Sequence, residues 1–140
     1  MILTLRILHG ILGLSAIGIC LSILILGPSA IAGFSESQFN AVTGSSYPPA
    51  GPWPATMDSE LRFYAPFWGA YGLVLLAIAR DMSAKLRYVP TMALLFFVGG
   101  VGRGLSYISV GAPHPFFIAL MAVELLLPLL FLALWRGARP

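Results

Sequence analysis

Charged side chains are scarce in this sequence, at 9% of 140 residues. A soluble domain carries roughly 25% of them. The chain therefore lacks the polar surface that water requires, and a soluble globular domain is excluded. Cysteine is scarcer still, because Cys20 is the single one in the sequence. No intrachain disulfide can form, and cysteine usage does not indicate the redox compartment. The length fits one domain.

Hydrophobic residues, in contrast, make up 59% of the chain, and the mean hydropathy is +0.91. A helix needs about 20 mostly apolar residues to span a membrane. The apolar runs do not alternate with polar residues as the strands of a membrane barrel do. We therefore predict an all-α fold, an integral membrane four-helix bundle that forms a single transmembrane domain over 1–140. The predicted helices cover about 5–26, 60–79, 88–110 and 115–135.

The first apolar stretch has an alternative interpretation as a secretory signal peptide. Arg6 precedes the run, and Ala30-Ile31-Ala32 fits an A-x-A cleavage site. The run is longer than the 7–15 residues typical of a signal peptide's apolar region. The length therefore favours a spanning helix.

Lysine and arginine outside the helices predict the orientation. The connections at about 27–59 and at 111–114 contain neither residue. Cytoplasmic connections are enriched in both, so we expect both termini and the 80–87 loop in the cytoplasm. The basic charge is thus a topology signal, and no nucleic-acid motif accompanies it. The six residues that predict this orientation are Arg6, Arg80, Lys85, Arg87, Arg136 and Arg139.

The predicted outer loop, about 27–59, is the largest polar segment. Its dense prolines at 47–54 predict an extended course, and 34–39 could form a short surface helix. Two interpretations stay open. The loop is either a connector lying over the bundle or a lid or strap on which a partner docks.

Two ionisable residues inside the last two helices are predicted to form a pair. Arg103 lies eight residues before Gly111, and Glu124 lies nine residues after Pro115. At 1.5 Å per residue both sit roughly 12–14 Å below the outer end. A lone charge in a membrane is costly, so we expect Arg103 and Glu124 to contact each other.

A second set of polar residues lies at the outer start of the helix at 60–79. Glu60, Tyr64, Phe67 and Tyr71 recur on one helical face. If this face points inward, it meets the Arg103–Glu124 pair. Asp58 is expected to cap the helix, and Arg62 to extend toward the headgroups. The predicted intramembrane polar cluster contains Glu60, Tyr64, Arg103 and Glu124, with Arg62, Tyr71 and Tyr107 as secondary members.

Pairs of small residues predict close helix packing. Gly100 and Gly104 fit this role better than a phosphate-binding loop, because no Lys-Ser/Thr follows. Ala65–Gly69 and Gly18–Ser22 fit it too. His9 and His114 lie far apart and form no predicted metal site, and we expect His114 to be solvated. No catalytic set or cofactor is predicted.

The segments Glu60-Leu-Arg-Phe-Tyr64 and Gly102-Arg103-Gly104-Leu105-Ser106, together with Glu124, resemble a bacterial family of small four-helix membrane proteins of unknown function. That family is similar to the DoxX-like group. The resemblance implies a bacterial inner-membrane protein in which Glu60, Arg103 and Glu124 matter. DoxX-like relatives are associated with quinone-linked redox systems as small subunits.

Two functions are expected from these features. The first is a non-catalytic accessory subunit that binds a larger membrane protein partner. The alternative is a binder of a lipophilic small molecule, a quinone or a lipid, in an outer-half polar pocket. An enzyme is the least favoured class, because no nucleophile and base lie at suggestive spacing.

Overall fold

The computed structural model describes residues 1–49 and 51–138, and contains helices but no strand within them. Arg139, one of the six residues that predict the orientation, lies outside this range. The long helices α1, α3, α5 and α6 are apolar enough to cross a membrane. The bounds are α1 Ile2–Leu26, α2 Pro28–Thr43, α3 Ala55–Arg80, α4 Met82–Lys85, the 3₁₀ turn Leu86–Tyr88, α5 Val89–Val110 and α6 Pro115–Ala138.

The four predicted spans are confirmed, with small shifts at their ends. The largest shift is in α3, which begins at Ala55 where the sequence predicted a start near 60. Pro54 stands at the N-cap position, and its carbonyl accepts a hydrogen bond from the Asp58 backbone N–H at 3.0 Å. Proline disfavours the helical conformation for the residue that precedes it, so the Pro-rich segment ends where α3 starts.

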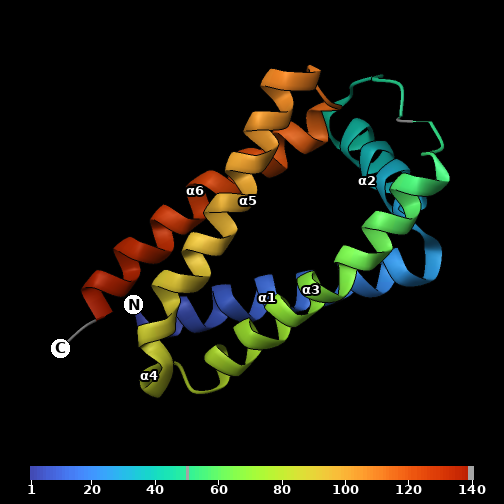
Figure 1. The fold of residues 1–140 in the computed structure, drawn as a ribbon. Helices are drawn as coiled ribbons and strands as arrows, with labels where there is room; N and C mark the ends of the chain where they lie inside the picture. The colour runs from blue at the N-terminus through green and yellow to red at the C-terminus, as the bar shows by residue number, and fades with distance from the viewer. Residues whose placement is uncertain (50, 139–140) are drawn as a thin grey trace.

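The spanning helices form two antiparallel pairs, α1 with α3 and α5 with α6 (Figure 1). The start of α1, the end of α6 and α4 lie at one end, called here the inner end, and the α5–α6 turn marks the outer end. The pairs meet near the inner end and diverge toward the outer end. The core where they meet contains Leu5, Leu75, Ile78, Met82, Val89, Met92, Ala93 and Phe131.

Helices α1 and α3 pack with almost no space between their backbones. A Cβ added at Gly72 would lie 2.7 Å from the Gly13 carbonyl oxygen, and one added at Gly69 would lie 2.8 Å from the Cys20 sulfur. Only glycine permits such an approach. The predicted packing role of Ala65–Gly69 is confirmed, and Cys20 is a buried packing residue.

Aromatic side chains connect the two pairs halfway along the bundle. Trp68 stacks on Tyr71 of the same helix, and both rings stack on Phe96 of α5. The Tyr71 hydroxyl donates a hydrogen bond to the Met92 carbonyl at 3.0 Å. These contacts place Tyr71 between the inner core and the more open outer half.

The prediction that about 27–59 form a loop is wrong over part of its length, because 16 of these residues form α2. The short helix expected over 34–39 extends from Pro28 to Thr43. Pro28 is suited to a first helical turn, and Gly44 ends the helix with φ of 67°, which glycine adopts easily. Of the predicted extended segment, 47–49 and 51–54 form no helix.

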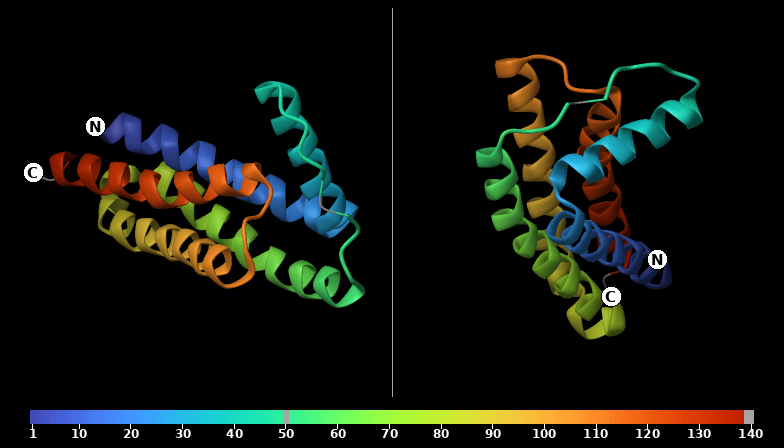
Figure 2. Two further views of the ribbon diagram at one scale, coloured as in Figure 1. Left: turned by 90° about the horizontal axis from the view of Figure 1, so that it is seen from above. Right: turned by 90° about the vertical axis from the view of Figure 1, so that its right-hand side faces the viewer.

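Helix α2 reaches across from the end of α1 to the start of α6 (Figure 2). Phe39 makes edge-on ring contacts with His114 and Phe116, and Tyr47 makes one with His114. His114 is half-buried and accepts a hydrogen bond from the Phe116 backbone N–H at 3.1 Å. The expectation of a solvated His114 is therefore wrong, because α2 covers it.

The expected packing role of Gly18–Ser22 is also wrong. No atom lies within 4 Å of a Cβ added at Gly18. Instead, Gly18 and Ser22 line an open groove of about 560 Å³ between α1 and α2. The reason is the rotation of α1, which turns Gly13, Ala16 and Cys20 toward α3 and leaves the Gly18 face uncovered.

Candidate functional site

The predicted contact between Arg103 and Glu124 is present. The Arg103 Nε donates to Glu124 Oε2 at 2.7 Å, from α5 to α6. The two side chains are 39% and 10% exposed, respectively. The carboxylate is thus enclosed, whereas part of the guanidinium remains accessible. The contact is confirmed, and its functional role stays a prediction.

Glycine spacing on α5 explains why the pair forms at this level. A Cβ added at Gly100 would lie 3.0 Å from the Glu124 Cβ, so α5 and α6 touch closely there. At Gly104, one turn further out, the nearest atom is the Met121 sulfur at 3.8 Å. Gly100 thus lies at a close contact between the two helices. Gly104 makes only an ordinary contact, so the two helices separate just beyond the ion pair.

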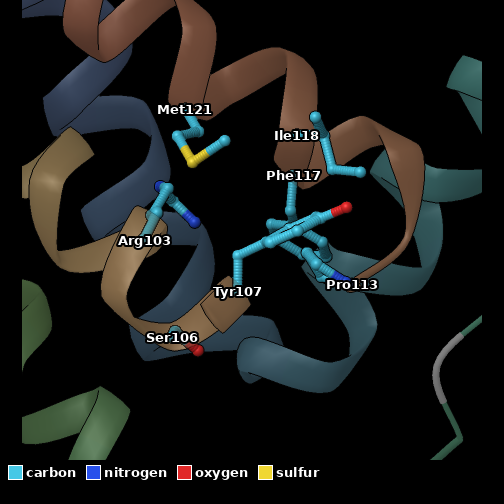
Figure 3. Close-up of a pocket in the computed structure, with 7 residues that line it drawn as sticks. All are labelled: Arg103, Ser106, Tyr107, Pro113, Phe117, Ile118 and Met121. Carbon is cyan, nitrogen blue, oxygen red and sulfur yellow. The ribbon is translucent and has the colours of Figure 1, made fainter. Parts of the chain in front are cut away.

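A small pocket occupies the space that opens between these helices (Figure 3). Its volume is about 110 Å³. The Arg103 guanidinium carbon also lies 5.8 Å from the centre of the Phe117 ring, within the range of a cation–π contact. The pocket is lined by Arg103, Ser106, Tyr107, Pro113, Phe117, Ile118 and Met121.

Glu60 and Tyr64 are not part of this site. Glu60 is exposed, and 57% of the Tyr64 surface is exposed. The expected inward orientation of their face is wrong, because the small residues of α3 turn toward α1 instead. The α3 and α5 helices have also diverged at this level (Figure 1). Among the described residues, no hydrogen bond or ion pair joins Glu60 or Tyr64 to Arg103 or Glu124.

Arg62 forms a second ion pair, within α3. Its Nε donates to Asp58 Oδ1 at 2.7 Å, and its Nη1 donates to the Leu24 carbonyl at 2.6 Å. Asp58 therefore pairs with Arg62 and does not cap α3, since the helix begins three residues earlier, at Ala55. Instead of extending to headgroups, Arg62 caps the end of α1, where carbonyls lack partners.

The two secondary tyrosines have different surroundings. Tyr71 hydrogen-bonds to α5 near the core and does not reach the pocket. Tyr107 lines the pocket one helical turn beyond Arg103. Of the predicted cluster and its secondary members, the structure brings together Arg103, Glu124 and Tyr107.

Sequence reasoning missed two buried polar residues. Glu36 is fully buried on the face of α2 that also holds Pro28 and Ala32. The spacing of four residues between them is the signal that could have revealed this face. His9 is fully buried on α1, where Nδ1 donates to the Leu5 carbonyl at 2.9 Å and the ring packs 4.7 Å from Phe131. Here a polar side chain belongs to the inner core.

Within residues 1–49 and 51–138, no group of three His, Cys, Asp or Glu residues could hold a metal ion. The fold and the site define a membrane-spanning helical bundle with one intramembrane ion pair beside a small pocket. The chain belongs to the family described as "Domain of unknown function (DUF4345)", whose model matches residues 4–135. No curated protein and no solved structure matches it.

Proposed function

We propose that this protein binds a lipophilic small molecule, a lipid or a quinone, whose polar end enters the pocket between α5 and α6. The observation that carries this proposal is the position of Arg103. Its guanidinium is held by a buried carboxylate at 2.7 Å, yet it lines a pocket whose other walls are mainly apolar. Charged residues at membrane depth are expensive and mark functional sites by default.

The two partners of this ion pair differ in exposure. Here Glu124 is enclosed and Arg103 is partly open. Guanidinium carries five N–H donors, and the contact with Glu124 uses one of them. Glu124 therefore orients the arginine, and the remaining donors are available to a molecule that enters from the bilayer.

The test is to purify the protein in a mild detergent and identify co-purified lipids and quinones by mass spectrometry. We expect Arg103→Gln to lower the amount of the retained molecule by about tenfold, the loss of one or two hydrogen bonds. Arg87→Gln is the matched control, because Arg87 is exposed at the inner end. Equal retention by both variants and the parent protein would refute the proposal.

A second candidate function, an accessory subunit of a larger membrane complex, is favoured by one face of α5. Gly99 and Gly102 are exposed on this face, and nothing lies within 4 Å of a Cβ added at either glycine. Small residues on a membrane helix let another helix approach. Gly99→Leu leaves the fold unobstructed and should reduce recovery of a partner after crosslinking, whereas retention of the small molecule should not change.

For orientation, we propose a bacterial plasma-membrane protein with both termini in the cytoplasm. The start of α1 and the end of α6 lie at the same end of the bundle as the α3–α5 connection (Figure 1), which follows Arg80 and contains Lys85 and Arg87. Reporter fusions at the C-terminus and after Ser46 should give opposite locations. The same location for both fusions would exclude this topology.

A further inference from the structure

The charge balance of the pocket identifies the kind of polar group that fits it. We propose that the group is an uncharged hydrogen-bond acceptor, a carbonyl carried on a hydrocarbon chain, and not an oxyanion. This inference rests on the proposed function and specifies its ligand class.

The first reason is that the positive charge is already compensated. Arg103 is the only charged residue among the seven that line the pocket, and Glu124 Oε2 lies 2.7 Å from its Nε. The formal charge of the pair is zero. A carboxylate or phosphate entering the pocket would meet the guanidinium but would also be repelled by Glu124. In a poorly screened membrane site, this repulsion cancels much of the attraction.

The second reason is that the polar lining is rich in donors. Within the described part of the chain, Arg103 donates its side-chain hydrogen bond from Nε, and none comes from Nη1 or Nη2. A guanidinium can donate but cannot accept. Tyr107 also lines the pocket, and its hydroxyl can donate a hydrogen bond. A carbonyl oxygen, with two lone pairs, complements such a lining without adding charge.

The third reason is size. At about 110 Å³, the pocket is well below the roughly 300–1,000 Å³ of sites that enclose a whole small molecule. It has room for a compact head group between Phe117 and Met121, and the rest of the ligand must remain in the bilayer. The ligand is therefore an amphiphile whose one end is a small carbonyl group.

Three probes of equal chain length separate the possibilities: 2-tridecanone, which has a ketone; tridecanoate, which has a carboxylate; and tridecane, which has neither. The protein is placed in nanodiscs of zwitterionic lipid, and the bound fraction of each probe is measured by native mass spectrometry. We expect the ketone to bind about tenfold more tightly than the alkane, equivalent to one net hydrogen bond. The carboxylate should bind more weakly than the ketone.

The Glu124→Gln variant tests the electrostatic argument directly. It keeps the shape of the side chain and removes the negative charge, so Arg103 is no longer compensated. We expect the affinity for tridecanoate to rise by about tenfold or more, with little change for 2-tridecanone. Asp58→Asn is the matched control, because it removes the carboxylate of the other arginine pair, on α3. It should leave the preference unchanged.

The outcomes separate this inference from the proposed function. If the parent protein prefers tridecanoate, or binds none of the three probes while Arg103→Gln still loses its co-purified molecule, the carbonyl assignment is wrong and lipophile binding stands. If Arg103→Gln changes neither the co-purified molecule nor the ketone affinity, both proposals fail. Should Glu124→Gln not fold, as judged by its thermal unfolding, the probe preference of the parent protein decides the assignment.

Discussion

The two helix pairs differ in how closely their helices approach along the interface. In the α1–α3 pair, Gly13, Gly69 and Gly72 let the backbones approach along several turns, and the ion pair of Asp58 and Arg62 stays at the outer end. In the α5–α6 pair, Gly100 supplies one tight contact, with Glu124, and the helices separate beyond the Arg103–Glu124 pair. The comparison shows that a glycine repeat continued along an interface closes it, whereas a single tight contact leaves space for a site.

The largest effect is expected from breaking the α5–α6 ion pair. Arg103→Leu leaves the enclosed Glu124 carboxylate without its partner and should lower the free energy of unfolding by about 2–3 kcal/mol. This value is below the full cost of a buried pair because Arg103 is partly exposed. Thermal unfolding in detergent measures the loss. The Arg103→Leu/Glu124→Leu double variant should recover part of it, and strictly additive losses would show that the two residues do not interact.

The next effect concerns the α1–α3 pair. Gly72→Ala places a methyl group 2.7 Å from the Gly13 carbonyl oxygen, so the helices must move apart. We expect a loss of about 1–3 kcal/mol in the free energy of unfolding. Gly18→Ala is the matched control on α1, where no atom lies within 4 Å; it should be neutral or slightly stabilising. Equal unfolding temperatures for the two variants would contradict the packing described here.

A smaller effect is expected at the outer end, where Arg62 links the two helices of the first pair. Arg62→Met removes the ion pair with Asp58 and the hydrogen bond to the Leu24 carbonyl. We expect a loss of about 1 kcal/mol, because both contacts are partly exposed. Hydrogen exchange at the end of α1 measures it. Unchanged exchange at residues 23–27 would show that Arg62 does not cap the helix.

The smallest effect is expected where α2 meets α6. Phe39→Ala removes two edge-on ring contacts, with His114 and Phe116. These contacts hold α2 at the periphery of the bundle, so we expect the global free energy of unfolding to fall by less than about 1 kcal/mol. The global unfolding temperature should fall little, whereas proteolysis within 44–54 should accelerate. Phe34→Ala is the control, since Phe34 is exposed on the same helix. Equal cleavage of the two variants would show that α2 is not held by Phe39.

Several features could be predicted from the sequence because they depend on local composition or on depth. The four spans follow from the length of apolar runs, and the contact of Arg103 with Glu124 follows from matching depth on two helices joined by a short turn. The face of α3 that turns inward could not be predicted. The helical period places Glu60, Tyr64 and Tyr71 on one face, but it does not say which face of the helix meets a neighbour. Only packing against Gly13 and Cys20 determines which face turns inward.

By itself, the sequence determined that four helices are long and apolar enough to cross a bilayer and that the charges of α5 and α6 meet, since dehydrating a backbone or an isolated charge is too costly for alternatives. The tertiary structure decided the rest. In it, the glycine face of α3 packs against α1, most of the outer segment forms α2, and a pocket lies between α5 and α6 beyond Gly100. Each of these depends on how closely two helices approach, and that distance is set by side chains from separate parts of the chain.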